Sequence, residues 1–402
     1  MLLRSLPSAE LPPRVLFLGS FPPRECGIAT FTRDVVESFD REYGTQSDVV
    51  AVDEPGGESR AYGDRVVARL PQDERSAYPR LARAIDAHPS DVLDVQHEYG
   101  LFGGTEGAWF LDCIEAVRKP VVVSLHTVLP EPTPKHDEVV RRICERADAV
   151  VVLSRTGAGL LQNVYNVDPL KVHVIHHGVP DVPFASTAAA KARFGLSGRS
   201  VVSTFGLISR GKGLEVAIEA MRTIVARRPD TTYLILGQTH PGVRRHEGES
   251  YREELTAAIA SNGLERNVAL VDRYLDFDEL IAYLGATDVY LTPYHNPVQI
   301  VSGTLAYAIG LGKAVVSTPY LYAMELLGGG HGSLVPFKNP PALAAAVLGL
   351  LEDDWARHSM ERRAYRFGRQ MTWPNVAREH AALFGMVASR RIFAAASLVR
   401  PA

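Results

Sequence analysis

Two cations lie among glycines in the segment STFGLISRGKGLEVAIEAM, residues 203–221. A strand-like run ends at Gly206, Arg210 and Lys212 follow in a short loop, and apolar residues at helical spacing predict a helix from Leu214 onward. Unpaired backbone N–H groups and the positive end of the helix dipole attract anions at such a position. The segment therefore predicts a phosphate or diphosphate site. The alternative is a solvated basic turn, and the GxxxxGKS or GxxxxGKT pattern of a Walker loop is absent.

The segment 288–320 predicts a second anion site on the same half of the chain. Its patterns of strand, loop, helix and strand follow in order, and Ser302 is suited to cap the helix. The backbone N–H groups of Ser302, Gly303 and Thr304 can cradle an anion at that helix start. Two cradles at the ends of neighbouring strands would hold one diphosphate from two sides.

The N-terminal half offers a glycine turn and two histidines at strand ends. The turn, GSFPPRECGIATFTRD, lacks GxGxxG, so a dinucleotide fingerprint is not supported. Cys26 beside Gly27 at a helix start is either a nucleophile or a small residue that allows close approach. His97 and His126 each end a strand-like run. A lone histidine usually has a structural role, but the pair indicates one histidine in a cleft, and we favour His126.

The remaining histidine cluster does not predict a metal site. His173, His176 and His177 follow another strand-like run, but their spacing matches no ligand set of a structural or catalytic metal. We therefore expect the protein to need neither a metal nor another cofactor.

These residues must be positioned by an α/β architecture, because short β-branched runs alternate with longer helical patterns along most of the chain. Ligands of open α/β sheets bind beyond the carboxyl ends of the strands, where the candidate residues are predicted to lie. The strands are expected at 14–20, 48–52, 91–95, 120–126, 149–154, 172–175, 200–206, 232–237, 268–272, 288–294 and 314–320.

The alternation breaks once, at residues 178–199, which contain glycines and prolines but no strand-like run. We therefore predict two Rossmann-like, doubly wound domains that face a cleft. The predicted pieces are an N-terminal domain at 1–183, a linker at 184–199, a C-terminal domain at 200–372 and a final helical segment at 373–402.

Composition excludes several other classes of protein. The chain has 402 residues, 46% hydrophobic and 22% charged, as in globular domains. Its 43 basic and 46 acidic residues leave no uniform basic field for nucleic acid. Three cysteines argue against a disulfide framework, and no signal peptide or transmembrane run is present, so we expect a soluble cytoplasmic protein. The C-terminus, 389–402, predicts a frayed helix or else a weak peripheral membrane contact.

Taken together, the motifs resemble those of the retaining, nucleotide-sugar-dependent glycosyltransferases of family 4, group 1, which have the glycosyltransferase-B fold. GSFPPRECGIATFT is similar to the first loop near the acceptor, and SLHT, which contains His126, to the strand-end histidine. FGLISRGKG is similar to the donor-phosphate loop, with Lys212 at the position of the family's lysine. HHGVPD, GKAVVSTPY and the Trp373 segment match in order and spacing, so the resemblance spans nearly the whole chain.

The chain departs from the family where two glutamates eight positions apart are usual. Anchoring on GKAVV puts Gln299 and Tyr307 at those positions. The amide can bond sugar hydroxyls and the phenol can reach a ribose, but neither carries charge. Leu207 replaces a customary arginine, with Arg210 close enough to substitute, and Glu325 is an alternative carboxylate near the nucleotide.

The resemblance implies transfer of a hexose from a UDP- or GDP-sugar to a hydroxyl of a saccharide or other glycan acceptor. It also implies that 1–183 is the acceptor-side domain, that 200–372 is the donor-binding domain and that 373–402 is a helix returning to the first domain. The sequence does not distinguish the base, the sugar, the acceptor or the oligomeric state. The alternatives are a non-catalytic nucleotide-sugar or glycan-binding protein, which the missing glutamates favour, and a phosphorylase or epimerase of the same fold. The implied site comprises the catalytic residues His126, Arg210, Lys212 and Gln299, the donor-binding residues Gly206, Ser302, Gly303, Thr304, Tyr307 and Glu325, and the acceptor-side residues Gly27 and His97.

Overall fold

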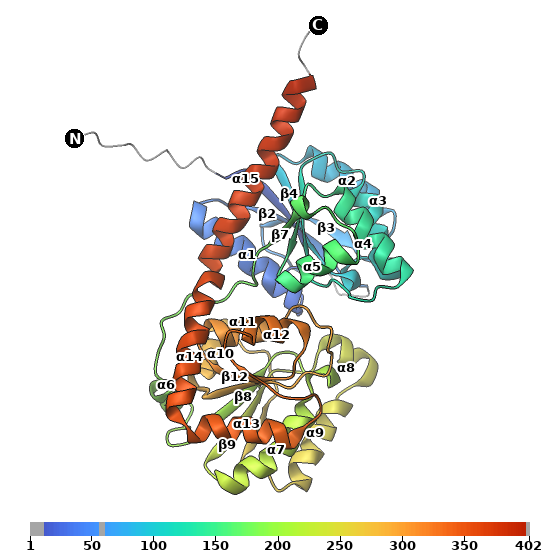
Figure 1. The fold of residues 1–402 in the computed structure, drawn as a ribbon. Coiled ribbons are helices and arrows are strands. Elements are labelled where there is room, and N and C mark those ends of the chain that lie inside the picture. The colour runs from blue at the N-terminus through green and yellow to red at the C-terminus, as the bar shows by residue number, and fades with distance from the viewer. Residues whose placement is uncertain (1–11, 56–60, 399–402) are drawn as a thin grey trace, which may run out of the picture. The chain divides into compact units, whose positions relative to one another are not determined.

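A computed structural model describes residues 12–55 and 61–398 of the chain. The chain divides into two compact units: unit 1 comprises Met1–His176 and Trp373–Ala402, and unit 2 comprises His177–Thr372. Each unit is a parallel sheet with helices on both faces, which can be followed separately for each sheet in Figure 1. The predicted pair of Rossmann-like domains is therefore confirmed.

Unit 1 is built on a seven-stranded parallel sheet in the order β3-β2-β1-β4-β5-β6-β7. The strand order reverses between β1 and β4, and ligands of such sheets bind at the switch point. Its strands are β1 (Val15–Gly19), β2 (Asp48–Asp53), β3 (Val66–Pro71), β4 (Val92–His97), β5 (Val121–Leu125), β6 (Ala149–Val152) and β7 (Val172–Val174). Its helices include α1 (Gly27–Tyr43), α2 (Ala77–Ala87), α3 (Leu111–Ile114), α4 (Pro134–Arg146), α5 (Arg155–Asn163) and α15 (Trp373–Leu398).

Unit 2 is built on a six-stranded parallel sheet in the order β10-β9-β8-β11-β12-β13, with its own switch point between β8 and β11. Its strands are β8 (Ser200–Phe205), β9 (Thr231–Leu236), β10 (Val268–Val271), β11 (Val289–Thr292), β12 (Ala314–Ser317) and β13 (Ser333–Leu334). Its helices include α6 (Thr187–Arg193), α7 (Leu214–Arg227), α8 (Pro241–Glu247), α9 (Ser250–Ser261), α10 (Phe277–Ala286), α11 (Gly303–Gly310), α12 (Leu321–Leu327), α13 (Pro340–Glu352) and α14 (Asp354–Gly368).

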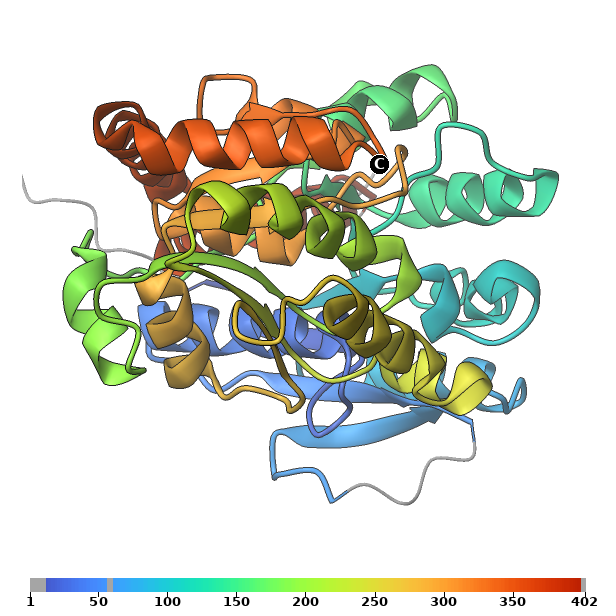
Figure 2. The ribbon, with the colours of Figure 1, turned by 90° about the horizontal axis from the view of Figure 1, so that it is seen from below.

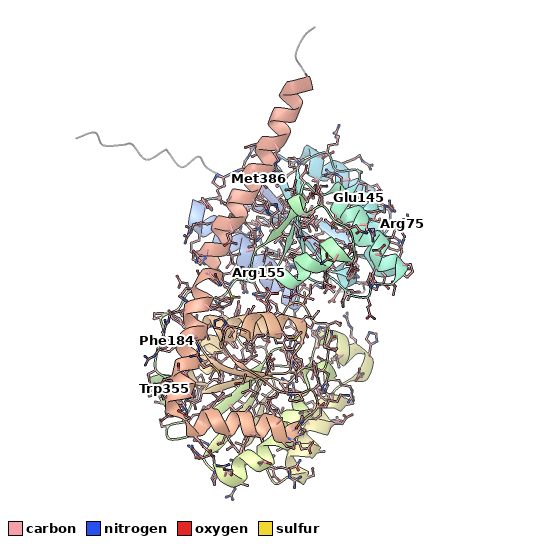
Figure 3. All side chains as sticks on the ribbon, in the orientation of Figure 1. Arg75, Glu145, Arg155, Phe184, Trp355 and Met386 are labelled. Atoms are coloured by element: carbon pink, nitrogen blue, oxygen red, sulfur yellow. The ribbon has the colours of Figure 1, made fainter. Side chains whose placement is uncertain are left out.

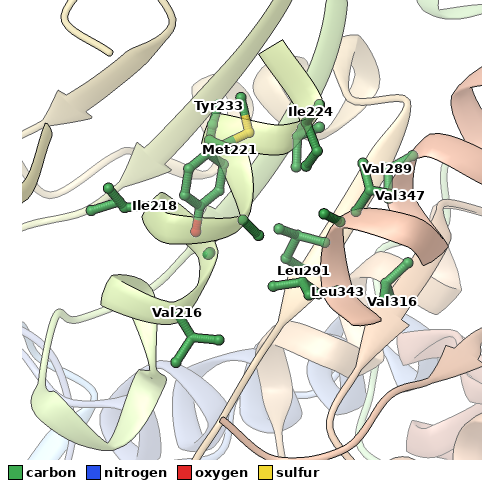
Figure 4. Close-up of a cluster of buried hydrophobic side chains, with 14 of the residues drawn as sticks. Val216, Ile218, Met221, Ile224, Tyr233, Val289, Leu291, Val316, Leu343 and Val347 are labelled. Atoms are coloured by element: carbon green, nitrogen blue, oxygen red, sulfur yellow. The ribbon is translucent and has the colours of Figure 1, made fainter. Parts of the chain in front are cut away.

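A buried apolar cluster holds α7 and α13 on the sheet of unit 2 (Figure 4). The two helices lie side by side (Figure 2), and Ile218 and Met221 of α7, three positions apart in the apolar pattern that predicted this helix, belong to the cluster. Leu291 of β11 and Leu343 of α13 belong to the same cluster. Truncating a buried side chain of this size typically costs about 2–5 kcal/mol. The cluster therefore fixes the start of α7, and with it the loop that contains the two cations.

The segment predicted as a linker, 184–199, is part of unit 2. It contains α6, from which Lys191 Nζ donates to both carboxylate oxygens of Asp288 at 2.6 and 2.8 Å. Before α6, Phe184 packs against Tyr365 of α14, the helix on which Trp355 is also labelled in Figure 3. The chain passes between the units at His176–His177 instead. The glycines and prolines of this segment predicted a linker, because the sequence alone does not show the tertiary contacts of Lys191 and Phe184.

The last helix, α15, packs within unit 1. Phe384 lies edge-on to Phe17 of β1 and to Phe39 of α1, with ring centroids 6.1 and 5.8 Å apart. The predicted frayed end or membrane contact at 389–402 falls largely on side chains from residue 391 onward, which lie outside the described part. None of the described helices combines the length and hydropathy that a membrane crossing requires.

Candidate active site

Two loops of unit 2 meet beyond the carboxyl ends of the neighbouring strands β8 and β11. The loop after β8 contains the predicted phosphate segment, and the loop after β11 leads to α11. The backbone N–H of His295 donates to the carbonyl of Gly211 at 2.9 Å and ties the loops together. Gly213 has φ 62°, and a Cβ at Gly213 would lie 2.1 Å from the carbonyl oxygen of Pro293. Only glycine allows the two loops this close an approach.

The side chain of Lys212 lies at the end of β8. Gly206 has φ 120°, and a Cβ there would lie 3.2 Å from Lys212 Nζ and 3.1 Å from Thr304 Cγ2. Lys212 Nζ donates to Tyr294 Oη at 3.2 Å and lies 4.7 Å from the centroid of that ring. Because the Tyr294 oxygen accepts from the ammonium, its own proton can be donated to Thr304 Oγ1, 2.6 Å away. The ammonium of Lys212 and the hydroxyls of Tyr294 and Thr304 thus lie together beside Gly206. This set of groups suits an anionic oxygen ligand.

The helix α11 begins at the residues where the sequence predicted it. Ser302 is its N-cap, and Ser302 Oγ accepts from the backbone N–H of Leu305 at 3.3 Å. The same Oγ lies 3.2 Å from Thr304 Oγ1. The first N–H groups of a helix have no partner within the helix, so those of Gly303 and Thr304 are available to water or to an anion.

A buried histidine lies against the start of α11. A Cβ at Gly303 would lie 2.7 Å from His177 Nε2. His177 Nδ1 donates to the carbonyl of Gly178 at 2.8 Å, and burial lowers the pKa of His177 to about 4. The imidazole is therefore neutral at physiological pH and adds no positive charge to this helix start.

Arg210 is directed away from this meeting point, to partners on α8 and α9. Its guanidinium donates to both carboxylate oxygens of Glu254 at 2.7 Å and to Glu247 at 3.1 Å. It also lies over the ring of Tyr251, 5.1 Å from the centroid. Hydrogen bonds to Glu254 and then to Glu247 raise the pKa of Arg210. Of the two predicted cations, Lys212 therefore lies beside Gly206 and Thr304, and Arg210 does not.

The two residues at the positions of the usual glutamates hold local structure together. Gln299 Nε2 donates to the carbonyl of Val301 at 2.9 Å. Tyr307 is buried on α11, with its ring 6.0 Å from that of His177 and 6.2 Å from that of Phe205. Glu325 lies partly exposed on α12. Gln299 thus orders the loop before α11, and Tyr307 fixes the first turns of the helix against β8.

In unit 1, His97 and His126 are neighbours through the backbone, since the N–H of His126 donates to the carbonyl of His97 at 3.0 Å. Their side chains have different surroundings. His126 Nε2 lies 2.9 Å from Gln96 Oε1. The His97 ring is fully buried and stacked on Phe102 at 5.5 Å, and burial lowers the pKa of His97 to about 3. His97 is therefore a neutral core residue in this structure, and His126 is the histidine with polar contacts.

The glycine turn of unit 1 ends in a helix cap. Cys26 is the N-cap of α1, and its Sγ accepts from the backbone N–H of Ala29 at 3.3 Å. The same sulfur lies 3.2 Å from Ser20 Oγ. Gly27 is exposed, and a Cβ there would meet none of the described atoms within 4 Å. The turn therefore has space beside Gly27 that the rest of the described chain does not fill.

Sequence reasoning missed Tyr294 and Gln96, which bond two of the predicted residues. Tyr294 lies two residues after the end of β11, at the end of the run 288–294 that was expected as a strand, and Gln96 is the next-to-last residue of β4. A polar side chain at the carboxyl end of a buried strand was the signal that selected His126, and it applies equally to these two.

Family models match the two units in turn. A model of glycosyltransferase family 4 matches residues 26–181, and a model of the group 1 glycosyl transferases matches residues 199–353. The first range contains His126 and the second contains Lys212 and Ser302. The chain belongs to the family 4, group 1 glycosyltransferases.

This glycosyltransferase resembles known proteins over most of its length. It is 26% identical to the D-inositol 3-phosphate glycosyltransferase of Corynebacterium glutamicum (strain R), over 73% of this chain and 72% of that protein. Among solved structures, Anabaena HepE in complex with UDP has a TM-score of 0.72 at 18% identity, covering 93% of this chain and all of HepE (100%). The sucrose-phosphate synthase of Thermosynechococcus elongatus has a TM-score of 0.74 at 18% identity, covering 95% of this chain and 100% of that chain. The fold is thus the glycosyltransferase-B fold.

Proposed function

We propose that this glycosyltransferase moves a hexose from a UDP- or GDP-sugar to a hydroxyl of a saccharide or other glycan acceptor, with retention at the anomeric carbon. The observation that carries the proposal is the meeting of Lys212 Nζ, Gly206 and the start of α11 at Thr304. An ammonium, two hydroxyls and helix N–H groups are suited to a diphosphate. The complex of Anabaena HepE with UDP adds support for a nucleotide-sugar donor.

In the proposed mechanism the diphosphate is the leaving group. Lys212 and the N–H groups of Ser302, Gly303 and Thr304 stabilise the negative charge that develops on it, as an oxyanion hole does. The bond from the anomeric carbon to the phosphate oxygen breaks, and the acceptor oxygen bonds to that carbon on the same face. The acceptor proton passes to the departing phosphate, so no enzymic nucleophile is needed.

The remaining predicted residues have supporting roles in this proposal. Gln299 and His126 contact the sugar. Arg210 joins the diphosphate after leaving Glu254. Tyr307 and Glu325 lie on the nucleotide side, and Gly27 and His97 on the acceptor side. In this proposal side chains supply the cations, so turnover needs no metal. Addition of EDTA tests this point, and we expect it to leave the rate of transfer unchanged.

The proposed location is the cytoplasm. The three cysteines, Cys26, Cys113 and Cys144, are all free, as is usual in a reducing compartment.

A thermal-shift panel of UDP-, GDP- and ADP-sugars, followed by a product assay with saccharide acceptors, tests the proposal. A ligand that binds only the folded state raises the unfolding temperature by mass action. We expect a shift with a UDP- or GDP-sugar, and a product whose anomeric proton retains the donor configuration. The proposal is wrong if no nucleoside diphosphate sugar raises the midpoint, or if the product is inverted.

The same assay separates the alternatives. Binding without turnover across varied acceptors would indicate a non-catalytic nucleotide-sugar or glycan-binding protein. Dependence on inorganic phosphate would indicate a phosphorylase, and interconversion of nucleotide sugars without an acceptor an epimerase.

A further inference from the structure

The central strand β4 of unit 1 contains polar residues where apolar ones are expected. It pairs with β1 on one side and β5 on the other, and strands buried on both faces usually read as continuous apolar runs. Asp94 and Gln96 of β4 are nevertheless both 0% exposed. They are two residues apart, so their side chains leave the same face of the sheet. A buried carboxyl and amide cost stability unless a hydrogen bond compensates them.

These two side chains form a chain of hydrogen bonds that ends at His126. Gln96 Nε2 donates to Asp94 Oδ2 at 2.6 Å, and Gln96 Oε1 lies 2.9 Å from His126 Nε2. An ionised carboxylate can only accept, so the amide must turn its NH₂ group to Asp94. Its carbonyl oxygen then faces His126, and this oxygen can only accept. His126 Nε2 therefore carries a proton, and in the neutral ring Nδ1 is the acceptor.

Packing leaves the chain little freedom to rearrange. A Cβ at Gly19, at the end of β1, would lie 3.0 Å from Gln96 Cβ, so the amide stem lies directly against that backbone. The ring of Phe31 on α1 meets the His126 ring edge-on, with centroids 4.8 Å apart and planes at 89°. In addition, His126 is only 6% exposed. The ring is held in orientation by packing and in tautomer by the amide.

Burial also disfavours the charged form of the Asp94 carboxyl. It raises the pKa of Asp94 to about 7, and Asp94 Oδ1 has no hydrogen-bond partner in the described part of the chain. An apolar residue at this position would avoid that cost, which indicates that the carboxylate serves the residues bonded to it.

We propose that Asp94 and Gln96 are positioning residues that keep the proton of His126 on Nε2, so that Nδ1 accepts a hydrogen bond from a hydroxyl of the donor sugar. The role of Nδ1 rests on the proposed function, in which His126 contacts that sugar. The tautomer itself follows from the hydrogen bonds within unit 1 and does not depend on activity.

Nitrogen NMR of the full-length, ¹⁵N-histidine-labelled protein tests the tautomer directly. The His126 resonances are assigned by their loss in His126→Asn, and spectra are recorded above the Asp94 pKa of about 7. We expect a protonated Nε2 and an unprotonated Nδ1 in the wild type, and a mixture of tautomers in Gln96→Met. A wild-type ring protonated on Nδ1, or an unchanged tautomer in Gln96→Met, would overturn the proposal.

A double-mutant cycle on kcat/KM for the donor tests the functional coupling. We expect Gln96→Met alone to lower kcat/KM about 10- to 100-fold, by analogy with partners that orient ligating histidines. In a protein that already carries His126→Ala, Gln96→Met should lower kcat/KM almost no further. Asp94→Asn keeps the shape of the side chain and removes its charge, and its smaller loss of kcat/KM should likewise depend on the presence of His126. This variant replaces Gln96→Met in the cycle if Gln96→Met does not fold. Additive losses would overturn the proposal.

Asp40→Asn is the matched control, because Asp40 is a buried carboxyl of unit 1 that lies on the helix α1 and bonds Ser47 and Arg65. We expect it to lower the unfolding temperature and to leave kcat/KM unchanged where the protein is folded. A protein that transfers no sugar at all would refute the proposed function, whereas the NMR result would still decide the tautomer. Transfer with additive losses would refute this inference alone.

Discussion

The side chain of Lys212 folds back over Gly206, so that Lys212 Nζ lies 3.2 Å from the position a Cβ at Gly206 would take. The same position is 3.1 Å from Thr304 Cγ2. The absence of a side chain at one residue thus creates the space in which the cation and the start of α11 approach each other. This space is where the proposed diphosphate would bind.

Gly206→Ala should therefore weaken donor binding strongly. The new methyl group presses on Lys212 and Thr304, and alanine at φ 120° adds backbone strain of about 1–3 kcal/mol. Gly211→Ala is the control in the same loop, since a Cβ there meets no described atom within 4 Å. Calorimetry with the donor should show a loss of affinity in the first variant only. Equal affinities in the two variants would remove Gly206 from the site.

Lys212→Ala should lower kcat far more than it changes stability. Loss of one group that stabilises a developing oxyanion costs about 3 kcal/mol, or roughly 100- to 1,000-fold in rate. Arg222→Ala removes an exposed cation from α7, the helix that follows the Lys212 loop, and should leave turnover unchanged. Steady-state kinetics with saturating donor decide the matter, and turnover by Lys212→Ala at the wild-type rate would contradict the phosphate-loop assignment.

Glu254→Gln should tighten donor binding if Arg210 joins the diphosphate. In the structure Arg210 is held by both oxygens of Glu254 in an exposed ion pair, and such pairs contribute little free energy. Releasing that pair therefore predicts a small gain in donor affinity. Glu253→Gln, an exposed neighbour on α9, is the charge-matched control. A gain in the control as well would point to general charge rather than to Arg210.

Lys191→Met should destabilise unit 2. Lys191 is the cation paired with Asp288, which is 5% exposed and also accepts from the backbone N–H of Val201 at 2.7 Å. Leaving a buried carboxylate without its cation costs about 3–5 kcal/mol. Arg193→Met, on the same helix but exposed, should cost much less. Urea unfolding followed by circular dichroism measures both, and equal losses would show that 184–199 is not anchored by this pair.

His380→Leu should reduce the loss of stability in acid. His380 of α15 is 0% exposed, and burial lowers its pKa to about 4. In the unfolded chain the ring titrates near its ordinary pKa of about 6.5. The contribution of the neutral His380 ring to the free energy of unfolding is therefore complete above pH 6.5. It is lost as the pH falls toward 4, because in this range only the unfolded chain takes up the proton. The loss amounts to about 3 kcal/mol, from about 1.4 kcal/mol per pKa unit.

Urea unfolding at a series of pH values between these limits measures that slope. The slope should flatten in His380→Leu but not vanish, since burial also lowers the pKa of His97 and of His177. His246→Gln replaces an exposed histidine and should leave the slope unchanged. An identical slope in the wild type and His380→Leu would show that His380 is not the buried group that opposes protonation.

The strands, the helices and the places where chemistry was expected could be predicted from the sequence alone. Alternating β-branched and helical patterns reflect local periodicity, so the strands β8 and β11 and the helix α7 from Leu214 were predictable. Ser302 was predictable as a cap because capping depends on residues within one turn. The family motifs around Lys212 and His126 are likewise short and local.

Which of these residues meet depends on the tertiary structure. Arg210 and Lys212 are two positions apart in one loop, yet Arg210 bonds Glu254 and Lys212 bonds Tyr294. Their partners are 44 and 82 positions away, respectively, in the sequence. In the same way, Gln96 joins Asp94 to His126 only because β4 and β5 pair in the sheet. Local patterns reveal a residue's chemistry, whereas the pairing of distant strands and the burial that follows determine what that chemistry acts on.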